Sequence, residues 1–330
     1  MINSEEFDSL YENALKPKLV ELDALRKKVS GRILKGLLMV LLGVALGVLC
    51  AWLDSREAEK LHIMLALAGA IAFVIAGVIV SVTARKPHKE YRRRYKEEVV
   101  REVVKAINPE WTYESEQGIS EGEYRESGLF PTKHDRYRCD DLVYGTMEKT
   151  DFRCSEVHSE KKVVSYDKDG HRQERWETIF HGLFFHADFN KHFHGKTFVE
   201  PDFAERFLGG LGASLQKISD KGELVKLENV EFEKLFVVHG SDQIEARYIL
   251  TPTMMEAIVA IAKAWKFPVR LSFVGSRVYF AIHFMQNLFE PKTWKSCVNI
   301  DEARKLFRLF KTNEVIIREL QLNTRIWTKD

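Results

Sequence analysis

Four histidines crowd into one short stretch of this chain, at positions His181, His186, His192 and His194. Two or three neutral imidazoles can hold zinc or another transition metal. The spacing argues against such a site, because residues an odd number apart, as His181 and His186 are, face opposite sides of a strand. No H-E-x-x-H pattern and no matching Cys/His spacing accompanies them. The sequence therefore predicts no metal centre and no cofactor.

A carboxylate beside a histidine could instead provide acid and base chemistry. Asp188 lies where a predicted strand ends, close to His186, and Glu156, His158 and Glu160 alternate along another strand, so that they share one face. The catalytic candidates are therefore Asp188, His186 and His158. The competing interpretation is structural, since Asp forms turns and alternating polar residues often make the solvated face of a strand.

Other motifs indicate structural roles. Ser241 to Arg247 is typical of a helix start, with Ser241 as the cap and Asp242 at the positive end of the dipole. Asn323 to Trp327 either docks an aromatic side chain on the domain or presents a motif to a partner. The chain contains no G-x-x-x-x-G-K-[ST] loop and no G-x-S-x-G elbow.

Two apolar segments predict a membrane protein. Gly36 to Leu53 and Ile63 to Ala84 carry no charged residue. At about 1.5 Å per helical residue, each segment can cross a hydrocarbon core of roughly 30 Å. A transporter or proton path usually needs ionisable groups inside the membrane, and neither segment has one.

The charges that flank these segments predict their orientation. Lys and Arg are abundant before the first segment and after the second, whereas the short connection holds only Arg56 and Lys60. Under the positive-inside rule both termini are cytoplasmic. The four cysteines have no C-x-x-C spacing, which fits a reducing compartment. The net charge of +2 gives no argument for nucleic acid.

Small residues recur at helical spacing in both apolar segments. Gly43 and Gly47 form G-x-x-x-G in the first, and Ala68, Ala72 and Ala76 continue the pattern in the second. Such stripes allow helix backbones to approach closely in lipid. They predict packing within the hairpin or, alternatively, contact between hairpins of separate chains.

Two amphipathic helices are predicted on the cytoplasmic side. Residues 4–30 carry an apolar stripe that Pro17 should kink or break. Lys89 to Ile107 forms the second helix. Its basic beginning lies where lipid headgroups would be, as ordinary anchoring or as a specific lipid site. The expected headgroup contacts are Arg85, Lys86, Lys89, Arg92, Arg93, Arg94 and Lys96.

The remainder of the chain predicts an α+β domain with a mainly antiparallel sheet, because strands and helices cluster and do not alternate strictly. A capping box, Ser120 with Glu123, begins one short helix. Another helix is expected from Pro201 to Ser219. The predicted organisation is a cytoplasmic helix at 1–32, a transmembrane hairpin at 33–84 (spans 36–53 and 63–84), a basic helix at 85–108 and a domain at 109–330.

Several segments resemble the DUF3137 family of uncharacterised bacterial membrane proteins. They are GISEGEYRESGLF (118–130), DRYRCDDLVYG (135–145), FRCSEVHSE (152–160), GLFFHADFNKHFHGKTFV (182–199), FEKLFVVHGSDQIEARYILTP (232–252) and LQLNTRIWTK (320–329). The resemblance extends over roughly residues 89–329. It implies a bacterial protein with two N-terminal spans and a LemA-type membrane protein as a partner, but no activity and no catalytic residues.

Taken together, these patterns favour a membrane-anchored interaction or scaffold module of the bacterial inner membrane, with the lipid bilayer and its own copies as further partners. The alternative is a membrane-surface hydrolase that uses Asp188 and nearby histidines. A channel built from several hairpins is a third hypothesis, which the uncharged spans disfavour.

Overall fold

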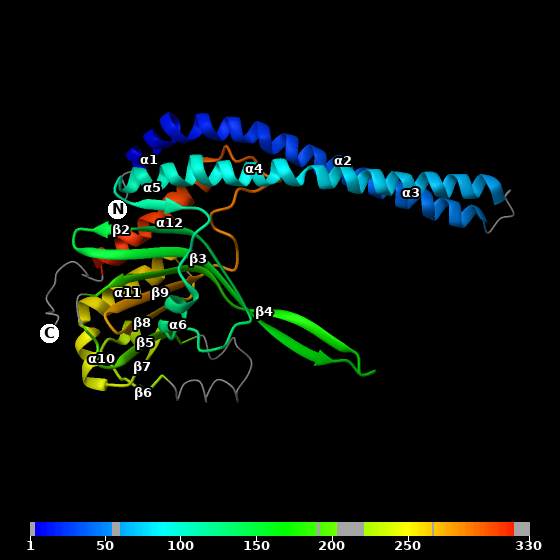
Figure 1. The fold of residues 1–330 in the computed structure, drawn as a ribbon. Coiled ribbons are helices and arrows are strands. Elements are labelled where there is room, and N and C mark those ends of the chain that lie inside the picture. Colours follow the sequence, from blue (N-terminus) through cyan, green and yellow to red (C-terminus); the bar gives the residue numbers. More distant parts are fainter. Residues whose placement is uncertain (1–3, 55–59, 190–191, 203–220, 266, 320–330) are drawn as a thin grey trace. The chain divides into compact units, whose positions relative to one another are not determined.

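The computed structural model describes the chain except residues 1–3, 55–59, 190–191, 203–220, 266 and 320–330 (Figure 1). The fold is α+β, as predicted, and forms two compact units. The helical unit comprises residues 1–102 and 290–305, and the sheet unit comprises residues 103–289 and 306–330. The division between the two compact units lies at Glu102/Val103, and a late segment of the chain, residues 290–305, is part of the helical unit.

The helical unit is built on two long antiparallel helices, α2 and α3 (Figure 1). Helix α2 joins the predicted cytoplasmic helix and the first apolar segment without interruption. Both long helices meet the length and hydropathy expected of a membrane span. The elements are α1 (Ser4–Leu10), the π-turn η1 (Tyr11–Leu15), α2 (Lys16–Asp54), α3 (Lys60–Thr83), α4 (Arg85–Tyr95), the π-turn η2 (Lys96–Val100) and α5 (Arg101–Ile107).

Pro17 does not break the N-terminal helix in two, one of the two outcomes predicted for it. The helix instead widens into η1 directly before the proline, and the Lys16 N–H bonds to the Tyr11 carbonyl, five residues back. Proline lacks an N–H and its ring collides with the carbonyl four residues earlier. A single π-turn at this point lets the helix continue.

Glycines set the distance between α2 and α3. A Cβ atom added to Gly43 would lie 2.8 Å from the Ala70 carbonyl oxygen, and one added to Gly77 would lie 2.7 Å from the Gly36 carbonyl oxygen. Cβ atoms do not tolerate such distances, so only glycine permits this approach. Gly43 therefore lies at a close approach of the two helices, while a Cβ atom added to Gly47 would make a looser contact of 4.0 Å with the Ala70 Cβ.

The predicted alanine stripe on α3 does not form this interface. Ala68 and Ala72 are exposed and Ala76 is only half-buried. The contacting face of α3 is offset by one to two residues and repeats with steps of four and three, as in a left-handed helix pair. Its residues are Ala70, Val74, Gly77 and Ser81.

A segment near the end of the chain completes the helical unit. The buried Asp23 carboxylate accepts hydrogen bonds from Arg26 Nε (2.7 Å), Ser296 Oγ (3.0 Å) and the Cys297 N–H (3.3 Å). Arg26 also donates to the Thr293 carbonyl oxygen. Burial opposes ionisation, but the hydrogen bonds from Arg26 and Ser296 outweigh it and hold the pKa of Asp23 well below its usual range. These contacts join residues far apart in the sequence, so no local pattern predicted them.

The sheet unit contains, within its described residues, one nine-stranded antiparallel sheet in the order β1-β2-β3-β4-β9-β8-β5-β7-β6. Its two longest strands, β3 and β4, form the predicted hairpin across the turn at Asp167–Gly170. The strands are β1 (Thr112–Glu114), β2 (Arg136–Met147), β3 (Thr150–Tyr166), β4 (Arg172–Asp188), β5 (Lys196–Pro201), β6 (Glu223–Leu224), β7 (Phe236–Gly240), β8 (Val269–Val274) and β9 (Arg277–His283).

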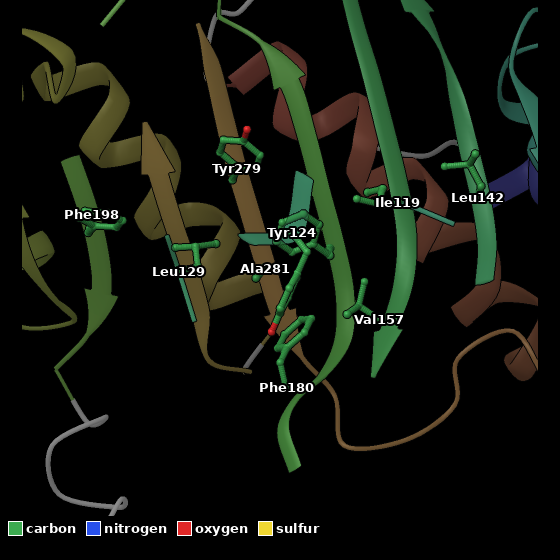
Figure 2. Close-up of a cluster of buried hydrophobic side chains, with 10 residues drawn as sticks. Ile119, Tyr124, Leu129, Leu142, Val157, Phe180, Phe198, Tyr279 and Ala281 are labelled. Atoms are coloured by element: carbon green, nitrogen blue, oxygen red, sulfur yellow. The ribbon is translucent and has the colours of Figure 1, made fainter. Parts of the chain in front are cut away.

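Helices cover both faces of the sheet. On one face, α6 (Glu121–Glu126) begins with the predicted Ser120–Glu123 capping box and contributes Tyr124 to the core in Figure 2. On the other face, Phe310 of α12 (Ile300–Glu319) packs on Tyr113. The remaining helices are α9 (Val230–Glu233), α10 (Gln243–Ile249) and α11 (Pro252–Trp265).

Asp242, and not Ser241, caps α10. Its carboxylate accepts the N–H groups of Ile244 and Glu245, whereas Ser241 Oγ accepts the N–H of Lys196 at 2.8 Å. The helix predicted from Pro201 to Ser219 and the motif at 323–327 lie outside the described residues.

The hairpin geometry predicts unequal effects of two similar substitutions. Gly43→Leu should lower stability by about 1–3 kcal/mol, because the new side chain must push α3 away. Gly69→Leu is the control, since an added Cβ there meets nothing within 4 Å. Thermal unfolding of both variants of the full chain in detergent should show a lower midpoint for Gly43→Leu only. Equal midpoints would contradict the close approach.

Candidate functional site

Two clusters of polar side chains lie on opposite faces of the β3–β4 hairpin. Residues 181 and 186 of β4 face opposite sides, as their odd separation predicts. We name one group the His181 cluster (Glu156, His158, Glu160, His181) and the other the Glu123 cluster (Glu123, Arg153, His186, Arg277).

The His181 cluster connects two neighbouring strands and a loop. His158 and His181 are directly opposite in the β3–β4 register, and their rings stack with centroids 4.3 Å apart. One oxygen of the buried Glu156 lies 3.2 Å from His181 Nε2, and the other accepts the Leu288 N–H at 2.9 Å. Both carboxylate oxygens are therefore engaged, and the loop after β9 is fixed to β3.

Glu160 lies at the outer end of the same row. Its Oε2 accepts hydrogen bonds from Arg136 and Arg138, each at 3.2 Å, and its Oε1 lies 3.8 Å from His158 Nε2. The Arg136 guanidinium also stacks over Trp176. Burial, followed by the charge of His181, lowers the pKa of His158. The row predicted from Glu156, His158 and Glu160 thus shares one face, and its charges are balanced internally.

Glu123 is the centre of the second cluster. As the third residue of α6 it accepts the Ser120 N–H at 2.9 Å and completes the capping box. Its other oxygen lies 2.9 Å from Arg153 Nη1 and 3.3 Å from His186 Nε2. The His186 contact is an ion-pair distance without the alignment of a good hydrogen bond. Glu123 therefore links the start of α6 to β3 and β4.

Arg277 determines the tautomer of His186. The Arg277 Nη1 lies 2.7 Å from His186 Nδ1, and a guanidinium can only donate. Nδ1 must then be the acceptor, and the proton of a neutral imidazole sits on Nε2, facing Glu123. Burial lowers the pKa of His186, which agrees with a neutral ring. In turn the His186 imidazole, followed by Ser120, holds the pKa of Glu123 well below its usual range despite burial.

The catalytic candidates are not brought together as one set. His186 and Asp188 alternate on β4 and share a face, whereas His158 lies on the opposite face of the hairpin. A single substrate cannot reach both histidines through the sheet. His192 and His194 lie in the loop after β4, where His192 Nδ1 contacts Ser276 Oγ and the His194 N–H donates to Glu245.

Among the described residues, the His, Cys, Asp and Glu side chains close enough to share a cation are Asp167, Asp169 and His171, at the exposed tip of the β3–β4 hairpin. The Asp167 carboxylate already accepts the N–H groups of Asp169 (3.0 Å) and His171 (2.8 Å). These bonds make a tight turn, in line with the turn role expected of this segment.

The basic residues expected at the headgroups fall into two classes. Arg92 pairs with Glu290, Arg93 with Glu90 and Glu97, Arg94 with Glu21 and Glu98, and Lys96 is buried. Arg85, Lys86 and Lys89 are exposed and make no ion pair within the described part of the chain. The charge count of the sequence could not separate these classes, because the carboxylate partners come from α2, α4, η2 and the late segment.

The Glu123 cluster predicts a pH-dependent stability. The pKa of Glu123 is depressed in the folded chain, so its stabilisation is present above the ordinary glutamate pKa of 4.5 and is lost as pH falls below it. Glu123→Gln should therefore cost about 1–2 kcal/mol at pH 7 and progressively less below pH 4.5. Denaturant unfolding of the full chain at several pH values measures this difference. Glu126→Gln, an exposed change on the same helix, is the control, and a pH-independent loss would contradict the assignment.

Comparison with known proteins adds little about function. No curated protein matches the chain at a significant level. A crystal structure of the mycobacterial trehalose monomycolate transport factor A, TtfA, aligns over 68% of this chain and 96% of its own, with 10% sequence identity and a TM-score of 0.35. A likeness at this level does not establish a common fold.

A family model described as "Protein of unknown function (DUF3137)" matches residues 178–322, from the inner half of β4 to the end of the chain's last described helix. The match is narrower than the resemblance at 89–329 suggested, but it includes the motifs at 182–199 and 232–252. Over residues 178–322, this chain is therefore similar to the DUF3137 family.

Proposed function

We propose that this protein is a membrane-anchored interaction module of the bacterial inner membrane. In this proposal α2 and α3 cross the bilayer as a hairpin, both termini are cytoplasmic, and the sheet unit binds a partner protein. The observation that carries the proposal is the exposure of the apolar side chains on α2 and α3.

The apolar surface of the hairpin is too large for water. Only 17% of the most apolar window of the first long helix, and 11% of that of the second, is buried. Exposed side chains include Leu41, Val48, Leu65 and Ile79, each more than half accessible. Soluble monomers rarely expose contiguous apolar patches beyond a few hundred Å². A core helix of a soluble protein would be covered, so lipid is the solvent that fits this surface.

Charge supports the orientation. Basic residues flank the hairpin at its open end, before Gly36 and after Ala84, and the short connection at the other end holds few. Under the positive-inside rule the open end is cytoplasmic. The sheet unit follows the open end in the chain and would fold on the same side.

The distal part of the β3–β4 hairpin offers a surface for a partner protein. We call Lys161–Tyr166 with Arg172–Glu177 the arm; it extends beyond the rest of the sheet (Figure 1). Within the described residues, β2 pairs with β3 only as far as Glu160, and β9 pairs with β4 only from Gly182. The arm therefore has no covering strand on either edge.

One face of the arm carries exposed apolar side chains among charged ones. Val164, Tyr166 and Trp176 lie on this face, with exposed fractions of 41%, 70% and 41%. Their cross-strand neighbours on the same face are charged: Glu174, Arg172 and Lys162. Two cross-strand ion pairs support the arm: Lys162 with Glu174 on this face, and Lys161 with Glu177 on the other. Charged edges discourage indiscriminate strand pairing. The aromatic face is thus the better candidate for specific binding, to a second copy or to a LemA-type protein.

The hydrolase alternative has no comparable support. It requires Asp188, His186 and His158 to act on one substrate, and the strand pleat separates His158 from the other two. A channel would require polar groups along the spans, and no Asp, Glu, Lys or Arg occurs in residues 36–53 or 63–84.

Membrane insertion predicts resistance to alkaline carbonate. Vesicles that contain the full chain should retain it after carbonate washing, because lipid covers the apolar band. A reporter fused after Asp330 should be active only on the cytoplasmic side. Release of the chain by carbonate, or reporter activity only outside the cytoplasm, would contradict the anchored topology.

Partner binding predicts contact at the arm. A photo-crosslinking amino acid at Tyr166, in the full chain in native membranes, should give a discrete adduct, with either a second copy or a LemA-type protein. The same probe at Lys149, an exposed residue in the short turn between β2 and β3, is the control. Equal, diffuse labelling at both positions would argue against a binding role for the arm.

A further inference from the structure

We infer that the cytoplasmic end of the hairpin binds anionic phospholipids through a ring of uncompensated basic side chains, which we name the basic collar. This inference rests on the proposed membrane insertion and adds the lipid class. The collar consists of Lys28, Arg32 and Lys35 on α2, Arg85 and Lys89 on α4, and Lys86, also on α4.

The register of the helices gathers these six residues at one end of the hairpin. Gly36 packs against Gly77 and Ser81, so the residues just before Gly36 and just after Ala84 lie at the same end of the hairpin. All six side chains are exposed, and none makes an ion pair within the parts of the chain that the structure describes. The collar is therefore a concentration of positive charge without an internal counterion.

The neighbouring basic residues provide an internal contrast. Arg93 lies 2.7 Å from Glu90 and 2.9 Å from Glu97, and Arg94 lies 2.7 Å from Glu21. Arg92 is matched by Glu290 in the late segment. One turn further along α4, carboxylates thus compensate the positive charges of the arginines. At the collar, no carboxylate of the described residues does so. Positive-inside insertion alone would not require this difference.

A shallow groove beside the collar has the chemistry of a lipid site. It runs along one side of α3 into α4 and is lined by Val78, Ile79, Val82, Thr83 and Lys86. Its floor is apolar and its cytoplasmic end is cationic. An acyl chain can lie along the valine and isoleucine side chains while the phosphate meets Lys86, whose stem can bend toward the interface.

An apolar groove beside a basic collar fits one class of ligand better than others. A soluble anion or a nucleic acid would leave the apolar floor unused, and a zwitterionic lipid would gain little from six positive charges. An anionic phospholipid, such as phosphatidylglycerol, supplies both the chain and the net negative charge.

The test measures which lipids remain on the protein. The full chain would be reconstituted in nanodiscs of equal parts phosphatidylglycerol and phosphatidylcholine, released, and examined by native mass spectrometry. Wild type should retain phosphatidylglycerol preferentially, and R85Q/K86Q/K89Q should reduce that preference about tenfold. Raising the salt concentration should reduce it in wild type, since the interaction is screened.

The matched control removes three exposed lysines of the sheet unit, K149Q/K226Q/K234Q, which should retain the wild-type preference. A second pair of variants tests the groove: Val82→Trp fills it and should lower the amount of bound lipid, whereas Val48→Trp, exposed on α2 near the opposite end, should not. Retention of the preference by the collar variant, or equal losses in the lysine control, would overturn the inference.

Carbonate washing of vesicles of the same lipid composition separates the two proposals. If wild type stays in the vesicles but binds both lipids equally, only the collar inference fails. If wild type is washed out, the membrane anchor fails and the collar inference fails with it.

Discussion

The structure depends on the packing of α2 on α3, in which one face of each helix must be small and the other faces large and apolar. The contacting faces need backbones close enough for dispersion contacts, which Gly36, Gly43 and Gly77 allow. The remaining faces carry large apolar side chains that no other described part of the chain covers. Association in lipid depends on close packing and not on expulsion of water, so small residues inside and large residues outside are the physically consistent arrangement. The proposed membrane anchor rests on this arrangement.

Local patterns predicted those features that local physics controls. The capping box at Ser120 and Glu123, the hairpin turn after Tyr166 and the two apolar segments follow from residue type and spacing over a few positions. The helical interface was harder to predict, because Ala68-x-x-x-Ala72 and Gly77-x-x-x-Ser81 satisfy the same small-residue rule, but only the second lies on the contacting face. The rotation of α3 about its own axis determines which of these small residues face α2. That rotation depends on every contact along the helix, so sequence spacing alone does not predict it.

In the candidate site too, sequence spacing predicted the local features but not the contacts between distant residues. Period-two alternation correctly separated His181 from His186 and grouped Glu156 with His158. It could not reveal that His158 stacks on His181, since strand register depends on the whole β3–β4 pairing. It also missed Glu123 as the partner of Arg153 and His186, because α6 precedes these strands and reaches them only in the folded sheet unit. Sequence spacing therefore indicated which side chains share a face but not which ones meet.

In both clusters, the polar side chains are already bound to other protein groups, unlike those of a typical catalytic centre. The oxygens of Glu156 and Glu123 are occupied by backbone N–H groups, arginines and histidines, and Arg277 fixes the imidazole of His186. Reactive groups usually keep one face open to a substrate. Here the polar side chains connect strands, α6 and the loop after β9, and they stabilise the platform from which the arm extends.

The bond between Asp23 and Ser296 also has a consequence for biosynthesis. The two residues are 273 positions apart, so at about 5–20 residues per second the ribosome needs roughly 14–55 s to deliver the second after the first. For that interval the carboxylate of Asp23 has only Arg26 and Lys27 beside it. Translation thus imposes an order of events in which α2 and α3 are synthesised early, while the helical unit closes only when the chain is nearly finished.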